Sequence, residues 1–337
     1  MRTAKWIQSS TVNIVGIAIM LFVTFLVFTD LTTWTSQWVT VPSSFLTLNT
    51  IFLSILIEAL PFVLLGVLIA GGIQVFVTED HMRRLIPNNK ILAVGMSALL
   101  GALFPACECG IVPITRRLVA KGVPIYAAIA FLLTGPLINP IVVFSTYMAF
   151  GHDWRMTTLR AVVGFFVAVA IACVISLLFK GSQLKRDPSL GTVITTPTRP
   201  PLRERVEHML VHAIDEFFYV SKFLIMGAFL AAIVQTYVAS STLTSLASGS
   251  ASSSLVMMGL AYLLSLCSEA DAFVAASFQH VFPTSALLAF LIYGPMLDLK
   301  NTIMMLGVFR TKFVLVFAIV TTVTVFGGIM LAQVWIG

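Results

Sequence analysis

Two nine-residue stretches with a shared pattern decide the fold. Phe131–Asn139 reads FLLTGPLIN, and Phe290–Asp298 reads FLIYGPMLD. Each places a Gly-Pro pair inside an apolar run, where we expect it to break a helix. Upstream, related stretches around Gly66 and Gly227 lie at nearly the same offset from these motifs. The sequence therefore indicates an internal duplication.

The composition excludes an ordinary soluble protein. Of 337 residues, 58% are hydrophobic and only 10% charged, and the mean hydropathy is +1.01, whereas soluble chains carry about 25% charged residues. Runs of about 20 apolar residues cross a bilayer. Such runs occur at Thr11–Thr29, Leu48–Val77 (with Glu58), Ala161–Phe179, His212–Val238 (with Lys222) and Phe313–Trp335. We predict an all-α polytopic membrane protein of about 8–10 helical segments.

The net charge of +6 resides in short loops rather than in one basic stripe, so nucleic acid is not an expected partner. Loops rich in Lys and Arg face the cytoplasm. This rule predicts a multi-pass protein of the cytoplasmic membrane, surrounded by lipid, with its N-terminus and the Glu79–Lys90 and Lys180–Arg205 loops in the cytoplasm. The expected organisation is an N-terminal span and outer loop (1–47), repeat 1 (48–179), a cytoplasmic linker (180–210) and repeat 2 (211–337).

With these loops inside, Leu48–Val77 and His212–Val238 cross the membrane in opposite directions, so the repeats have inverted topology. One broken segment in each repeat must then be re-entrant, and we expect the first to enter from the cytoplasmic side. Inverted repeats with interrupted helices are typical of transporters and place a binding site near the midplane.

The densest group of reactive side chains is Cys107-Glu108-Cys109, which lies between Pro105 and Pro113 in an apolar region. An extended segment here would let both thiols face one ion, since alternate residues then share a side. Thiolates bind zinc, copper(I) and other thiophilic species, and a carboxylate inside the membrane indicates function. Buried cysteine also serves as a small apolar residue.

A related cluster in the second half contains Cys267, Glu269 and Asp271. If the two clusters converge, they supply candidate substrate ligands, with Cys107, Cys109 and Glu269 as a metal-ligand set. The alternative is a surface loop with solvated charges.

Three further polar residues are candidates for the pathway. Asn139 and Asp298 follow the paired Gly-Pro breaks and either line a transport route or cap helices; Asp298 also has Lys300 nearby as a partner. Glu58 lies inside its span and acts either as a cation relay or as one half of an ion pair.

The segments Glu58–Phe62, Cys107–Pro113 and Lys121–Pro140 resemble the bacterial predicted-permease family, formerly a domain of unknown function, over most of the chain from about Leu48 onward. That family includes organoarsenical efflux permeases. The Cys-Glu-Cys pattern is similar to a branch associated with metal homeostasis and often paired with a small companion membrane subunit. The resemblance implies such a partner and a cytoplasmic-membrane permease.

We therefore expect a permease, not an enzyme, that moves a thiophilic metal or metalloid through a midplane site of cysteines and carboxylates. No GxxxxGK[ST] or HExxH motif occurs, which argues against an ATP-driven pump or a zinc protease. No cofactor is expected, and homo-oligomers are compatible with the pattern. Two alternatives stay open: a membrane thiol oxidoreductase that cycles the Cys107/Cys109 dithiol, and a non-transporting subunit that docks a partner.

Overall fold

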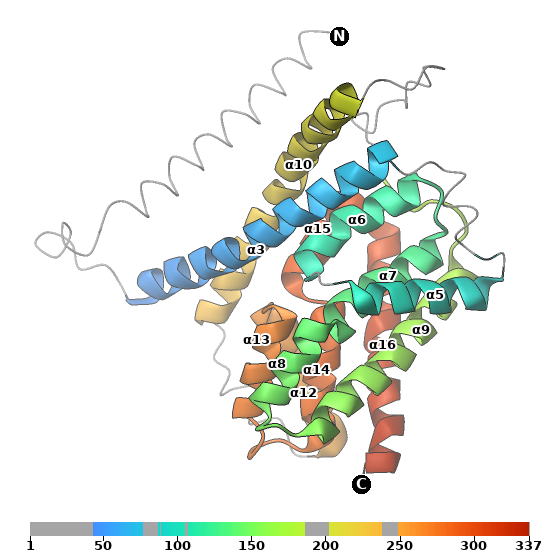
Figure 1. Ribbon diagram of the computed structural model, residues 1–337. Helices are drawn as coiled ribbons and strands as arrows, with labels where there is room; N and C mark the ends of the chain where they lie inside the picture. Colours follow the sequence, from blue (N-terminus) through green and yellow to red (C-terminus); the bar gives the residue numbers. More distant parts are fainter. Residues whose placement is uncertain are drawn as a thin grey trace, which may run out of the picture. The chain divides into compact units, whose positions relative to one another are not determined.

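The structure is a computed structural model that describes residues 43–76, 87, 89–104, 107–185, 202–237 and 249–336. These ranges contain helices only, apart from one isolated β-bridge between Leu184 and Phe309. The helices, labelled in Figure 1, are α3 (Ser43–Phe76), α5 (Lys90–Leu103), α6 (Glu108–Ala120), α7 (Ile125–Ile138), α8 (Pro140–Ala149), α9 (Trp154–Leu178), α10 (Leu202–Tyr237), α12 (Ser250–Leu264), α13 (Ser268–Ser277), α14 (Thr284–Met296), α15 (Leu299–Val308) and α16 (Thr311–Ile336). The predicted first span, Thr11–Thr29, lies outside the described residues.

Five segments within the described ranges are long and apolar enough to cross a membrane: Ser44–Val75, Ile125–Ala149, Trp154–Leu178, Met209–Tyr237 and Thr311–Val334. Four of them correspond to runs predicted from the sequence. The fifth combines α7 and α8, which meet at Asn139. The prediction of an all-α polytopic membrane protein is confirmed.

Among the described helices, those from α3 to α9 and those from α10 to α16 follow the same order of lengths: one long helix, four short ones and another long helix. The packing is also repeated. A Cβ on Gly135 of α7 would lie 2.2 Å from Ile111 of α6, and a Cβ on Gly294 of α14 would lie 2.6 Å from Asp271 of α13. Gly135 therefore lets Ile111, the fourth residue of α6, pack closely on α7. In the same way Gly294 lets Asp271, the fourth residue of α13, pack closely on α14.

The α5–α6 pair is a re-entrant hairpin. Lys90 at the start of α5 lines the same pocket as Val119 and Gly122 at the end of α6, together with Phe179 at the end of α9. We call this side of the membrane the Lys90 face. The chain of α16 starts at the same face, because Arg310 N donates to the Gln183 carbonyl at 2.9 Å.

The α12–α13 pair is the equivalent hairpin in the second repeat. Its first helix starts beside the start of α14, where the Ser250 and Ser285 hydroxyls lie 3.2 Å apart. We call this side the Ser285 face. The α14–α15 pair then leads to the Lys90 face, as shown by the Lys185 N to Val308 O bond of 3.0 Å. The two repeats thus run in opposite directions, as predicted.

The breaks do not fall at the prolines. Helix α7 continues through Pro136 to Ile138, α14 continues through Pro295 to Met296, and α6 continues through Pro113. The prediction that the Gly-Pro pairs break the helices was therefore wrong in position. Proline removes the hydrogen bond to the carbonyl four residues earlier and its ring crowds that carbonyl, but neighbouring helices in a packed membrane bundle compensate for this disturbance.

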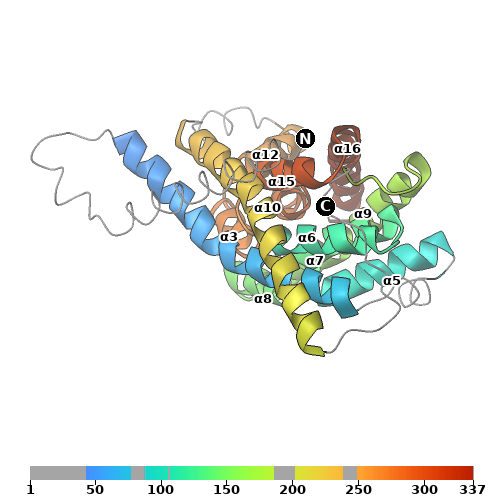
Figure 2. The same ribbon diagram turned by 90° about the horizontal axis from the view of Figure 1, so that it is seen from above.

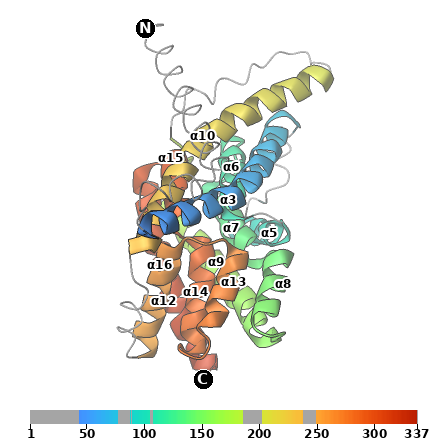
Figure 3. The ribbon, with the colours of Figure 1, turned by 90° about the vertical axis from the view of Figure 1, so that its left-hand side faces the viewer.

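The repeats pack into one compact unit from Leu48 to the C-terminus. Figure 2 shows α3 and α10 crossing over α6, and Phe52 of α3 packs edge-on against Phe229 of α10 with centroids 5.8 Å apart. Contacts also cross between repeats: α6 packs on α15, and α13 packs on α8 (Figure 3). These contacts bring the short helices of both repeats together.

Candidate functional site

The two re-entrant hairpins turn at equivalent cysteines. Cys107 is the N-cap of α6 and Cys267 is the N-cap of α13, and both have extended backbones, with ψ of 172° and 157°. Figure 1 shows the first turns of these two helices close together, with the helices directed away from each other. Helix N-termini carry partial positive charge, so each hairpin turn presents a thiol beside a positive helix end.

A hydrogen bond joins the two turns. The Ser268 hydroxyl, on the first residue of α13, donates to Oε1 of Glu108, on the first residue of α6. Arg160 of α9 reinforces this contact: its Nη2 donates to the Ser268 carbonyl at 3.2 Å, and its Nη1 donates to Oγ1 of Thr146 at 2.6 Å. The structure therefore brings the two predicted clusters together.

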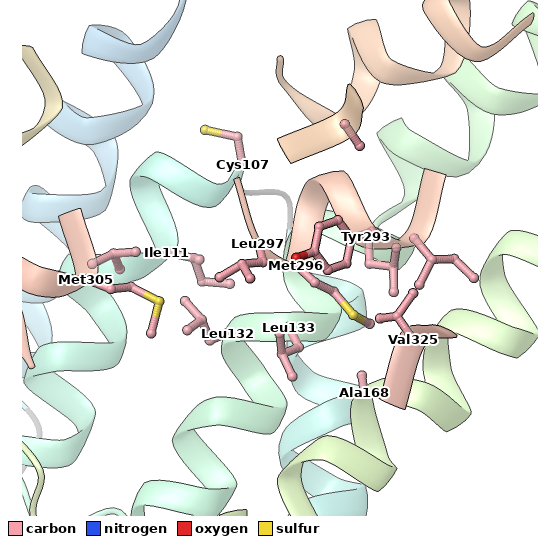
Figure 4. Close-up of a cluster of buried hydrophobic side chains, with 14 of the residues drawn as sticks. Cys107, Ile111, Leu132, Leu133, Ala168, Tyr293, Met296, Leu297, Met305 and Val325 are labelled. Carbon is pink, nitrogen blue, oxygen red and sulfur yellow. The ribbon is translucent and has the colours of Figure 1, made fainter. Parts of the chain in front are cut away.

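Cys107 and Cys109 are both buried free thiols, and their side chains interact with each other. Figure 4 shows Cys107 at the edge of an apolar cluster that includes Ile111 and Leu297, one from each repeat. The expected extended segment is confined to Cys107, since Cys109 already lies in the first turn of α6. The thiols nevertheless lie side by side, because Cys107 precedes the helix and its backbone direction differs.

The predicted residues of the second repeat have unequal surroundings. Asp271 is buried, and neither of its carboxylate oxygens has a hydrogen-bond partner. Glu269 and Cys267 are half-buried. The Cys267 thiol lies beside the carboxylate of Glu58, whose side chain is exposed. Glu58 thus faces the edge of the site.

Asn139 and Asp298 occupy equivalent N-caps. Oδ1 of Asn139 accepts from Val142 N at 2.8 Å, and Oδ1 of Asp298 accepts from Asn301 N. The capping interpretation is therefore confirmed for both residues. Oδ2 of Asp298 also lies 3.6 Å from the Lys300 ammonium, and both side chains are buried.

A preassembled metal centre is not present within the described part of the chain, where no three His, Cys, Asp or Glu side chains are grouped closely enough to hold an ion. Cys107, Cys109 and Glu269 therefore stay a predicted ligand set. Cys107, Glu108 and Cys109 follow one another at the α6 turn, so any further ligand, such as Glu269 of α13, has to come from the second repeat.

The burial of two cations was not predicted from the sequence. Arg160 stands immediately before the run predicted as a span, so it resembled an interfacial charge. Lys300 was predicted only as a partner for Asp298, and the 3.6 Å contact confirms that pairing. The exposed fractions of Arg160 and Lys300 are 2% and 3%. A basic residue adjacent to a span or a helix break was the available signal.

A second buried charge network holds the outer end of the first hairpin. Arg116 Nη1 and Arg117 Nη2 of α6 contact the two carboxylate oxygens of Glu216 of α10 at 2.5 and 2.6 Å. Lys121 Nζ donates to the Gln74 carbonyl of α3 at 2.7 Å. In α13 the positions equivalent to the two arginines are Ala276 and Ser277, so this connection belongs to the Lys90 face.

Comparison with known proteins agrees with this architecture. The profile of a family described as "Predicted permease" matches residues 44–334. The chain belongs to this predicted-permease family. It is 51% identical over 294 residues to the UPF0718 protein YcgR of Bacillus subtilis, covering 87% of this chain and 99% of that protein. It is 43% identical over 276 residues to a putative two-component membrane permease complex subunit of Streptococcus mutans, covering 82% and 91%. No solved structure matches the chain.

Membership in the predicted-permease family identifies a multi-pass membrane permease. A third, more distant relative is the UPF0718 protein MJ0584 of Methanocaldococcus jannaschii, 29% identical over 141 residues, which cover 41% of this chain and 38% of that protein. Neither the substrate nor its binding residues follow from these names.

Proposed function

We propose that this permease carries a thiophilic metal or metalloid species across the cytoplasmic membrane through a midplane site at the turns of its two re-entrant hairpins. The observation that carries the proposal is the hydrogen bond from Ser268 to Glu108, which joins the hairpins beside the Cys107 and Cys109 thiols. The substrate ligands we propose come from both repeats: Cys107, Glu108 and Cys109 from the first, and Cys267, Glu269 and Asp271 from the second. Asn139 and Asp298 shape the site as caps, and Glu58 lies at its edge.

The chemistry of these ligands supports a soft cargo. Two adjacent thiols bind zinc, copper(I) and trivalent metalloids better than they bind hard cations. One oxygen of Glu108 and both oxygens of Asp271 are buried without a hydrogen-bond partner, and an incoming cation would satisfy them. Transport also requires weak binding, because a cargo has to leave again. In our proposal the ligands from the two repeats surround the cargo only when the hairpins move together, so binding stays weak enough for release.

The repeat geometry supports alternating access. Each hairpin opens to a different face, and both turns meet in the interior. Small displacements of α6 against α13 would expose the thiols to the Lys90 face or to the Ser285 face in turn. A cation gradient or the membrane potential, worth about 2.3 kcal/mol per charge per 100 mV, would drive the cycle.

The relative from Streptococcus mutans is named as a subunit of a two-component complex. We propose that this chain likewise works with a second membrane subunit. Transport should therefore be measured first in cells of the native host, where such a partner is present.

The test is elemental analysis of cells with and without the protein, exposed to zinc, copper or trivalent arsenic. We expect the content of one element to change when the protein is present, to revert in the Cys107→Ser/Cys109→Ser variant, and to persist in a matched Cys173→Ser control on α9. Equal contents in all samples contradict transport. A disulfide that forms between Cys107 and Cys109 during activity, with no change in metal content, would instead favour a thiol oxidoreductase.

A further inference from the structure

Lys300 occupies an unusual position for a lysine. It is the second residue of α15, and its side chain is 3% exposed. The crossing of α10 over α15 encloses it, because Gly227 of α10 has no side chain: a Cβ there would lie 3.1 Å from the Lys300 Cα. A buried charge within the membrane is costly and indicates a function.

Its polar contacts are loose. The ammonium lies 3.3 Å from the Ser265 carbonyl oxygen and 3.6 Å from Asp298 Oδ2. Arg160, the other buried cation of the site, has a shorter bond of 2.6 Å to Thr146 and also contacts Ser268. Arg160 thus has two hydrogen bonds to neighbouring helices, whereas Lys300 has one hydrogen bond and one ion pair at the end of a long flexible side chain.

Ser265 is shaped to support this lysine. Ser265 is the C-cap of α12, and its backbone lies in the left-handed region, with φ of 50° and ψ of 40°, a conformation that often ends a helix but is uncommon for a residue other than glycine. Its hydroxyl accepts the Lys300 backbone N–H at 3.0 Å, and its carbonyl faces the ammonium. The α12–α13 turn therefore provides a docking position for the side chain.

On its other side Lys300 faces the cysteine cluster of the first repeat. Helix α15 packs on α6, and the ammonium interacts electrostatically with Cys109, Glu108 and Cys107. Glu108 Oε2 has no hydrogen-bond partner. Lys300 thus lies between Asp298 in its own repeat and the predicted substrate ligands in the other.

We propose that Lys300 is a built-in counter-cation that exchanges places with the cargo. In the cargo-free state its ammonium balances the charge of Glu108 and the thiols. When a cationic cargo binds there, the ammonium retracts to Asp298 and the Ser265 carbonyl, and its return promotes release of the cargo. This inference rests on the proposed function and adds a release mechanism to it.

The exchange has a clear physical advantage. Replacing one cation by another keeps the charge of the buried site nearly constant, which avoids the large cost of an unbalanced ion in low dielectric. Competition by the ammonium also lowers the affinity for cargo, and weak binding permits fast release. Removing the lysine should consequently strengthen binding and slow transport.

The experiment measures Cd²⁺ binding to the purified full chain by titration calorimetry, and Cd²⁺ flux in cells of the native host, where the proposed second subunit is present. For Lys300→Met we expect about tenfold tighter binding with about tenfold slower flux. Lys300→Arg keeps the charge and should restore most of both values. A matched control is Lys222→Met, because Lys222 is an exposed lysine of α10 that contacts aromatic rings; its binding and flux should equal those of the wild type.

The double variant Lys300→Met/Asp298→Asn removes both charged partners, so it guards against misfolding caused by an unpaired Asp298. It too should bind Cd²⁺ more tightly than the wild type. Binding by the wild type with equal or weaker binding by both Lys300→Met variants overturns the exchange role alone. The titration is repeated with Cys107→Ser. Absence of Cd²⁺ binding, or binding that Cys107→Ser leaves unchanged, overturns the proposed substrate class together with the exchange role.

Discussion

The Ser268 hydroxyl and the Glu108 carboxylate form a buried hydrogen bond between the first residues of α13 and α6, which belong to opposite repeats. We expect Ser268→Ala to destabilise the protein by about 1–3 kcal/mol, because it leaves a buried carboxylate oxygen without a donor. Thermal unfolding in detergent measures this loss. The control is Ser277→Ala at the exposed end of α13, where the hydroxyl bonds only to the nearby Val274 carbonyl. Equal unfolding of both variants would show that the bond between repeats does not stabilise the fold.

Close packing of α3 on α6 depends on Gly66. A Cβ at this position would lie 2.2 Å from the carbonyl oxygen of Gly110, a backbone atom that cannot move aside. We expect Gly66→Ala to cost about 1–3 kcal/mol through overpacking. Gly95→Ala in α5 is the matched control, because no atom lies within 4 Å of its new Cβ. Because alanine has a higher helix propensity than glycine, Gly95→Ala should leave the stability of the protein unchanged or raise it by up to about 1 kcal/mol. Similar melting temperatures for the two variants would contradict the α3–α6 contact.

Glu216 joins α10 to the outer end of the first hairpin through Arg116 and Arg117. Glu216→Gln removes the charge while two arginines stay buried beside it, so we expect a loss of about 3–5 kcal/mol in stability. The neighbouring exposed Asp215 provides a control, and Asp215→Asn should change stability by less than about 0.5 kcal/mol. If Glu216→Gln is as stable as Asp215→Asn, the contacts of Glu216 with Arg116 and Arg117 are exposed to water and do not stabilise the fold.

The inverted topology is open to a direct labelling test. In a background without native cysteines, Ser182→Cys lies at the Lys90 face and Gln279→Cys lies next to the start of α14 at the Ser285 face. We expect an impermeant maleimide added outside intact cells to label the second position and not the first, because the basic loops should face the cytoplasm. Labelling of both from the same side would refute the opposite directions of the two hairpins.

Much of this architecture was predictable from the sequence. Apolar runs located four of the long helices, and the paired Gly-Pro motifs indicated the duplication. The predicted apolar span starts at His212, yet α10 starts at Leu202, because Arg and Glu residues there continue the helix beyond the membrane-length apolar segment. Helix ends that are polar do not appear in a hydropathy pattern.

The site was predictable only in part. Cys107, Glu108 and Asp271 carried their own signal, since charges and thiols are rare in apolar segments. The burial of Arg160 and Lys300 carried no such signal, because a basic residue near a span end normally extends to the interface; for Lys300 only the pairing with Asp298 was predicted. Their burial depends on contacts between repeats, such as Gly227 against Lys300, and these contacts arise from tertiary packing rather than from local pattern.

The central claim is that sulfur from Cys107 and Cys109 binds the cargo where the two hairpins meet. X-ray absorption spectroscopy of the purified protein loaded with Zn²⁺ tests this claim most directly. We expect sulfur neighbours at about 2.3 Å in the wild type and in Cys173→Ser, and only oxygen or nitrogen neighbours in Cys107→Ser/Cys109→Ser. A wild-type spectrum without sulfur neighbours, or one that the double substitution leaves unchanged, would contradict the account.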